Sequence, residues 1–190
     1  MLFVSPEDPY CRDGGANLRL RPFIEAVTET GESHLLTLGA DSCKIYSTGH
    51  YASLETVTNK PMRRITRLIR SLANLEPDIA TRSRTTRLAT ALHRLVLREK
   101  FDVVHLAGLQ LAYLIPAFLS TYGTLTKTLG RPVLVLDELN AEYVVHRRMA
   151  ASAAHGYKKL LSRIYSQCQM ALLKRYEKRL LPLCDVVLCP

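Results

Sequence analysis

Short apolar runs of strand length alternate along this chain with longer segments whose apolar residues recur at helical spacing. The pattern predicts strands at residues 2–4, 34–38, 101–106, 133–136 and 185–188, with a short candidate at 44–47. Apolar runs bounded by turn residues are typical of strands buried on both faces. Strands that alternate with helical segments predict βαβ units. The sequence therefore favours an α/β fold with a mostly parallel sheet.

The segments between these runs carry helix patterns. Helices are expected at about residues 21–30, 62–75, 85–98, 109–119, 141–149 and 157–181, and residues 120–130 are expected to be a connection. Pro22 fits near the start of the first helix, where a missing backbone N–H is tolerated. Gly31 and Pro182 are stop signals for the first and last helices.

The segment at residues 62–75 has the clearest amphipathic pattern. Its apolar residues recur at i, i+3, i+4 and i+7, and its arginines occupy the other face. The apolar set is Ile65, Leu68, Ile69 and Leu72, and the basic set is Arg63, Arg64, Arg67 and Arg70. Such a helix can contact an anionic membrane. It can equally be an ordinary surface helix with solvated arginines, and the pattern alone does not decide between the two.

Composition narrows the class of partner. Of the 190 residues, 26 are Lys or Arg and 17 are Asp or Glu, so the formal net charge is +9, which favours anionic partners. No helix-turn-helix, RNA-binding motif or aromatic stacking platform accompanies the basic helices, so nucleic acid is not expected. The five cysteines lack metal-ligand spacing. No run is long enough to span a bilayer, and we expect a cytoplasmic chain, at most attached to a membrane surface.

Candidate chemistry gathers at the end of the strand at 133–136. Asp137, Glu138 and Asn140 follow it directly, and polar groups past the carboxyl end of a strand line the ligand crevice of an open α/β sheet. Asp137 or Asn140 could instead cap the following helix. His105, near the end of another strand, is either a packed residue or a ligand contact. The first loop holds Gly14 and Gly15, but neither G-x-G-x-x-G nor a Walker motif is present.

Four segments, in this order, carry a resemblance to a known family. They are P-E-D-P-Y-C-R-D-G-G-A-N-L-R at residues 6–19, F-D-V-V-H-L at 101–106, V-L-D-E-L-N-A-E-Y at 135–143 and R-Y-E-K-R-L-L-P-L-C-D-V-V-L-C at 175–189. The chain resembles the N-terminal domain of retaining glycosyltransferases of the GT-B fold, family 4. That resemblance implies one Rossmann-like, doubly wound domain over residues 1–190 that binds the acceptor, and a separate donor-binding domain that this sequence does not contain.

The resemblance also assigns roles to residues. Gly14 and Gly15 match a glycine loop near the donor diphosphate, and Arg19 matches the basic residue after it. Catalytic candidates are Asp137, Glu138 and Asn140, and further substrate-binding candidates are His105, Glu142 and Tyr143. The family transfers sugar from a nucleotide-sugar donor with retention, usually without a metal, so no metal or cofactor is expected. Oriented hydrogen-bond donors for the leaving diphosphate are then the main catalytic requirement.

Two departures from the family lead to alternatives. Leu139 stands where members often have histidine, and leucine transfers no proton. The donor-binding domain is also absent, so we expect the chain alone to bind donor weakly and not to turn over. The first hypothesis is the acceptor-binding half of an enzyme that acts on a sugar or lipid-linked acceptor and needs a partner domain or subunit. The alternative is a non-catalytic domain that binds an anionic lipid surface or a protein.

Overall fold

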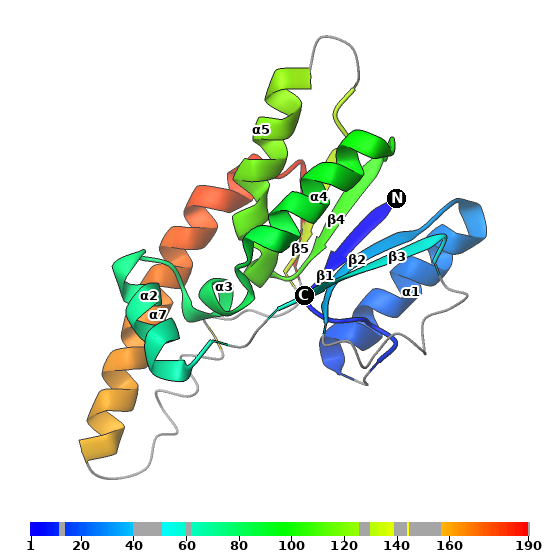
Figure 1. The fold of residues 1–190 in the computed structure, drawn as a ribbon. Helices are drawn as coiled ribbons and strands as arrows, with labels where there is room; N and C mark the ends of the chain where they lie inside the picture. The colour runs from blue at the N-terminus through cyan, green and yellow to red at the C-terminus, as the bar shows by residue number, and fades with distance from the viewer. Residues whose placement is uncertain are drawn as a thin grey trace.

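The computed structural model describes residues 1–11, 14–39, 51–59, 62–125, 130–138, 144 and 157–189. Within these residues, six parallel strands form one sheet in the order β3-β2-β1-β4-β5-β6 (Figure 1). The strands are β1 (Leu2–Ser5), β2 (His34–Gly39), β3 (Ser53–Thr58), β4 (Val103–Ala107), β5 (Val133–Asp137) and β6 (Val186–Leu188). Strand β1 pairs with both β2 and β4, so the order reverses between β1 and β4. The Rossmann-like doubly wound prediction is confirmed.

Five strands lie where apolar runs predict them, and β3 is the exception. It has one buried hydrophobic residue, Val57, and its other positions are half-buried or exposed. An edge strand rich in Ser, Thr and Glu lacks the continuous apolar run that marks a strand buried on both faces. For that reason the sequence did not predict it. The short strand expected at residues 44–47 lies outside the described residues.

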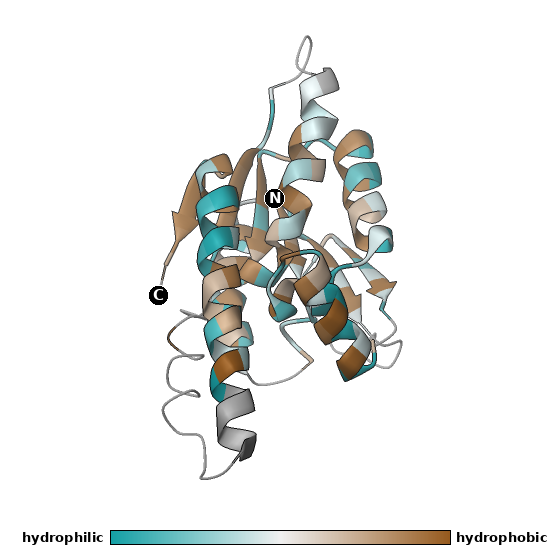
Figure 2. Ribbon diagram, turned by 90° about the vertical axis from the view of Figure 1, so that its left-hand side faces the viewer, coloured by the Kyte–Doolittle hydropathy of each residue, from teal (hydrophilic) through white to brown (hydrophobic). Residues whose placement is uncertain are grey.

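Helices cover both faces of the sheet. They are α1 (Gly15–Thr30), α2 (Arg64–Ala73), α3 (Asp78–Ser83), α4 (Thr86–Arg98), α5 (Ile115–Leu125) and α7 (Tyr157–Leu180), with 3-10 turns η2 (Leu109–Leu114) and η3 (Leu181–Leu183). Helices α4, α5 and α7 share the larger core with Leu2 and Val4 of β1. Helix α1 packs with Phe3, which points to the opposite face. In Figure 2 the strands are mostly brown, as expected for a sheet between two helical layers.

Two helix predictions need correction, and one helix was not predicted. Helix α1 begins at Gly15, not near residue 21, because Leu20 and Ile24 are both buried and their packing outweighs the hydrogen bond that Pro22 cannot donate. Helix α5 continues through Ser120 to Leu125, where a connection was expected, because Tyr122 is buried in the core. The short helix α3 was not predicted, although Pro77 and Asp78 provide a helix start.

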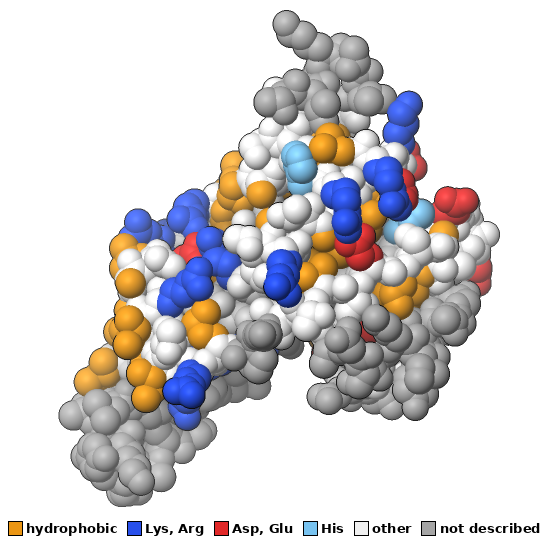
Figure 3. Space-filling view, viewed as in Figure 1, with side chains coloured by type: hydrophobic (Ala, Val, Ile, Leu, Met, Phe, Trp, Pro, Cys, Tyr) orange, Lys and Arg blue, Asp and Glu red, His pale blue; other side chains and the backbone are white. Residues whose placement is uncertain are grey.

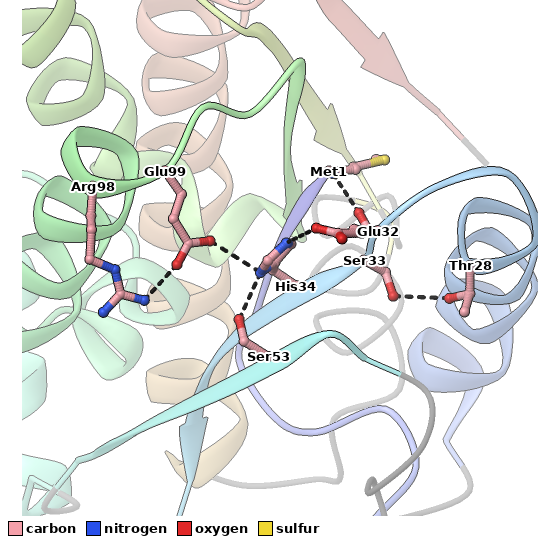
Figure 4. A network of polar contacts seen from close by, with 8 residues as sticks. All are labelled: Met1, Thr28, Glu32, Ser33, His34, Ser53, Arg98 and Glu99. Carbon is pink, nitrogen blue, oxygen red and sulfur yellow. Dashed lines mark hydrogen bonds and ion pairs between the residues drawn. The ribbon is translucent and has the colours of Figure 1, made fainter.

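A polar network lies at the amino-terminal edge of the sheet (Figure 4). His34 Nδ1 is 2.7 Å from Ser53 Oγ of β3 and 3.3 Å from Glu99 Oε2 at the end of α4. The amino group of Met1 donates a 2.7 Å hydrogen bond to the carbonyl of Glu32. The network therefore ties together the first residues of β1, β2 and β3, and it lies on the edge opposite the predicted site. None of the described helices has both the length and the apolar composition that crossing a bilayer requires.

Candidate functional site

Three of the predicted site residues meet between α1 and the sheet. Asp137 is the last residue of β5, His105 lies in β4, and Arg19 comes from the second turn of α1. Arg19 Nη2 is 3.0 Å from Asp137 Oδ1, and His105 Nε2 is 3.9 Å from Asp137 Oδ2. We call Arg19, His105 and Asp137 the carboxyl-edge cluster. It lies beside the point where the strand order reverses, which is where open α/β sheets bind ligands.

The charges of this cluster are set by burial. The Asp137 side chain is 0% exposed and that of Arg19 is 29% exposed. Burial raises the pKa of Asp137, and the guanidinium of Arg19 opposes that rise. The buried Asp137 carboxylate orients the Arg19 guanidinium. Of the three residues in the cluster, only Arg19 has an exposed surface that a ligand can contact. In this conformation Asp137 acts by positioning Arg19.

His105 is the neutral member of the cluster. Its side chain is 2% exposed, and burial, with a smaller contribution from the charge of Arg19, lowers its pKa from 6.5 to about 4. Neither ring nitrogen has a hydrogen-bond partner among the described residues. The ring contacts Phe3 edge-on, with centroids 5.3 Å apart, and Phe23 at 6.0 Å. Because it is buried among aromatic rings, the packed-residue interpretation of His105 fits better than direct ligand contact.

The start of α1 has the features of an anion-binding helix terminus. Gly14, the residue before the helix, has extended backbone and gives no side-chain cap, and the first turn contains no acidic residue. The backbone N–H groups of a first turn point outward and carry a partial positive charge. A side-chain atom placed on Gly15 would meet no atom within 4 Å, so there is room for a ligand at this position. Arg19, one turn further along, adds a positive charge.

The loop between β1 and α1 is held in place by its own polar contacts. Asp8 accepts a 3.0 Å hydrogen bond from the Tyr10 backbone N–H. Arg21 Nε donates to the Pro9 carbonyl at 2.9 Å, and Asn17 Nδ2 donates to Glu7 Oε1 at 3.2 Å. These contacts fix the approach to the first turn of α1. Glu7 and Asn17 were not predicted as site residues, and the polar run P-E-D-P after the first strand was the available signal.

Gly108 follows β4 at the same edge and adopts a conformation that favours glycine. Its φ is +106°, and its N–H donates a 2.8 Å hydrogen bond to the Asp137 carbonyl. We expect Gly108→Ala to lower the free energy of unfolding by about 1–2 kcal/mol, because an L side chain is strained at this φ. Urea unfolding measures the change.

Gly123→Ala is the matched control for that prediction. It lies inside α5, where an added methyl group meets no atom within 4 Å. Alanine in a helix interior is expected to raise the free energy of unfolding by about 0.5–1 kcal/mol. Equal effects of the two substitutions would show that the backbone at Gly108 is not strained.

The remaining predicted residues have different outcomes. Glu138 lies at the same edge, where its N–H donates to the Leu188 carbonyl at 2.8 Å and burial raises the pKa of its carboxyl group. Leu139, Asn140, Glu142 and Tyr143 lie outside the described residues. The capping alternative for Asp137 and Asn140 depends on that same segment and stays a prediction.

The arginines of α2 do not join the carboxyl-edge cluster. Arg63, Arg64 and Arg70 are exposed on a separate helix, and Arg67 pairs with Asp78 at 2.6 Å. Within the described ranges, no three His, Cys, Asp or Glu side chains lie where they could hold a metal ion together.

Comparison with models of known protein families, with curated proteins and with solved structures found no match to this chain. The resemblance to a glycosyltransferase family therefore rests on the four sequence segments quoted above, and the roles it implies stay predictions. The fold itself also does not identify a chemistry, since Rossmann-like sheets support many unrelated functions. What the structure contributes is the position of those candidate residues that it describes.

Proposed function

We propose that this chain is the acceptor-side half of a glycosyltransferase that moves a sugar from a nucleotide-sugar donor to an acceptor with retention. A separate donor-binding domain or subunit would complete the active site. On this proposal the glycine loop and the start of α1 face the donor diphosphate, and the edge of the sheet around Glu138 faces the acceptor. The chain alone then binds a donor weakly and does not turn over.

The observation that carries the proposal is the start of α1, which lies beside the reversal of strand order and has no side-chain cap from Gly14 and no acidic residue in its first turn. Gly14 and Gly15 lie at that position, and the Arg19 guanidinium is held one turn away by Asp137. A helix N-terminus without an acidic residue in its first turn favours an anion, and a neighbouring arginine strengthens that preference. A diphosphate is the anionic group that a sugar nucleotide presents to such a site.

The chemistry asked of these residues is electrostatic. Retaining transfer without a metal needs fixed hydrogen-bond donors for the charge that develops on the leaving diphosphate. The first-turn N–H groups of α1 and the Arg19 guanidinium are donors of this kind, and Asp137 fixes the guanidinium before any ligand arrives. His105, neutral at pH 7 because its pKa is about 4, adds no competing charge next to Arg19.

A location at the inner face of the cell membrane is part of the same proposal. A lipid-linked acceptor would be presented there, and the net charge of +9 favours the anionic lipid surface. This location requires a surface of the chain that contacts lipid.

The test of the proposed function uses Gly15. We expect Gly15→Asp to weaken the binding of a nucleoside diphosphate at least about tenfold, because a carboxylate in the first turn repels the ligand anion. The same carboxylate is favourable for the helix, so the fold is expected to be kept or slightly stabilised. Ligand-observed NMR on the purified chain, with uridine and guanosine diphosphates as probes, measures the binding.

Gly15→Ser is the matched control, since it adds a side chain of similar length without the charge. We expect its affinity to remain within about threefold of that of the parent chain, because a serine hydroxyl can still accept or donate beside the phosphate. Equal binding by the parent and Gly15→Asp chains, or no detectable nucleotide binding by the parent, would contradict a diphosphate site at α1.

A further inference from the structure

Helix α2 turns its apolar side to solvent. Ile65 is 74% exposed, Ile69 63%, Leu72 49%, and Leu75, just past the helix, 52%. We call these four residues the α2 ridge. The first three recur at i, i+4 and i+7, so they form one continuous stripe. Exposed hydrophobic residues scattered singly need no explanation, but a contiguous group marks an interaction site.

The buried residue of α2 is polar, which explains why the apolar side of the helix faces solvent. Ser71 is fully buried, donates a 2.6 Å hydrogen bond to the Glu76 carbonyl and accepts one from Gln169 Nε2 of α7 at 3.4 Å. Arg67 forms its ion pair with Asp78 of α3. These hydrogen bonds and this ion pair fix the rotation of α2 on α3 and α7. They direct the α2 ridge away from the core.

The charge around the α2 ridge selects the kind of partner. Residues 62–75 contain four arginines and no acidic residue, and Arg63, Arg64 and Arg70 are exposed. Figure 3 shows orange hydrophobic side chains at the outline of the molecule over α2, with blue basic side chains close by. A partner for this helix therefore needs an apolar interior and a negatively charged surface.

We infer that the α2 ridge inserts into the interface of an anionic lipid bilayer. A basic amphipathic helix of this kind lies in the plane of the interface, with its apolar side below the headgroups and its arginines among them. Each arginine near an anionic surface strengthens binding by roughly fivefold. The inference deepens the proposed function by naming the surface that contacts the membrane. It rests on the proposed function only for the reason why the chain would bind a membrane.

The position of α2 relates this contact to the candidate site. Strand β3 ends at Thr58, and α2 begins at Arg64, so α2 follows the carboxyl end of a strand. The carboxyl-edge cluster lies at the same end of the parallel sheet. Helix α2 and the candidate site therefore both follow carboxyl ends of strands in the same sheet.

A single tryptophan tests insertion directly, because the chain contains none. We expect Leu72→Trp to show a blue-shifted emission with vesicles of phosphatidylcholine and phosphatidylglycerol at low salt. Leu97→Trp, at a position on α4 that is equally exposed, is the control and is expected to show no shift. Equal shifts at both positions, or no shift at Leu72→Trp, would contradict insertion through α2.

Co-sedimentation with the same vesicles measures the contribution of each part. We expect Ile65→Ser/Ile69→Ser to weaken binding about tenfold or more, since two apolar side chains are lost from the interface. Leu97→Ser/Leu183→Ser, which removes two exposed leucines elsewhere, should change binding less than about twofold. Arg63→Gln/Arg70→Gln should weaken binding to anionic vesicles and leave the weak binding to pure phosphatidylcholine unchanged, whereas Arg87→Gln should have little effect.

Two outcomes would overturn the inference. One is failure of anionic vesicles to retain the parent chain at low salt. The other is a dimer, detected by light scattering, that Ile65→Ser/Ile69→Ser dissociates, because the ridge would then be a contact between copies of this chain. Failure here is distinguishable from failure of the proposed function: Gly15→Asp should leave vesicle binding intact, and the ridge variants should leave nucleotide binding intact.

Discussion

Replacement of Arg19 by glutamine is expected to lower the free energy of unfolding by about 3 kcal/mol at pH 7, because it leaves the Asp137 carboxylate buried without a positive partner. Asp137 is fully buried, and the Arg19 guanidinium, 3.0 Å away, is the basic group paired with it in the described residues. Urea unfolding followed by circular dichroism measures the change. Arg131→Gln, which breaks a partly exposed ion pair with Asp185, is the matched control and should cost no more than about 1 kcal/mol.

The pH dependence identifies the cause of that loss. Burial already raises the pKa of Asp137 above its ordinary value, and loss of Arg19 removes the charge that opposes the rise. A carboxyl group whose folded pKa is raised binds more protons in the native state. Its destabilising effect is therefore present at neutral pH and disappears as pH falls through the folded pKa towards the unfolded value. Arg19→Gln should thus regain stability relative to the parent on acidification.

The double variant Arg19→Gln/Asp137→Asn separates the effect of charge from the effect of packing. Without a charge on either side chain, the site no longer contains an uncompensated carboxylate, and we expect the double variant to be more stable than Arg19→Gln at pH 7. A double variant as unstable as the single one would instead assign the loss to the packing of the Arg19 side chain.

Much of the sheet could be predicted because its strands are buried on both faces. Leu2, Val104 and Leu134 come from continuous apolar runs, and each is fully buried. The position of Asp137 at the carboxyl end of a strand could be predicted for a related reason, since this polar residue directly follows an apolar run. The edge strand β3 could not, because one face of an edge strand needs no apolar side chain.

The sequence could not indicate which residues pair at the site or which way α2 faces. Arg19 and Asp137 lie far apart in the chain, and only the packing of α1 on the sheet brings them into contact. The amphipathic pattern of α2 identifies residues that share a face, but the rotation of the helix depends on Ser71 and Arg67, whose partners belong to other elements. Hydrophobic periodicity alone would place Ile65 and Ile69 towards the core.

Acidification is expected to destabilise the chain through His105. Its folded pKa is about 4, whereas an unperturbed histidine titrates near 6.5, so the unfolded state binds the extra proton first. Above about pH 6.5 the ring is neutral in both states and its titration does not affect stability. As pH falls from 6.5 towards 4, the unfolded state gains a proton that the native state does not, and the native state loses stability. The complete loss corresponds to about 3 kcal/mol. Protonation of Asp137 acts in the opposite direction, which makes a variant at His105 necessary.

His105→Leu should remove most of this slope between about pH 6.5 and pH 4. Leucine keeps the site apolar beside Phe3 and eliminates two buried ring nitrogens that lack hydrogen-bond partners in the described part of the chain, so stability at pH 7 should be kept or raised. His93→Gln, at a histidine that contacts Thr121 at 2.8 Å between α4 and α5, is the control and should keep the slope. An unchanged slope in His105→Leu would mean that another group carries the acid sensitivity, and that His105 is accessible to protons in the folded chain.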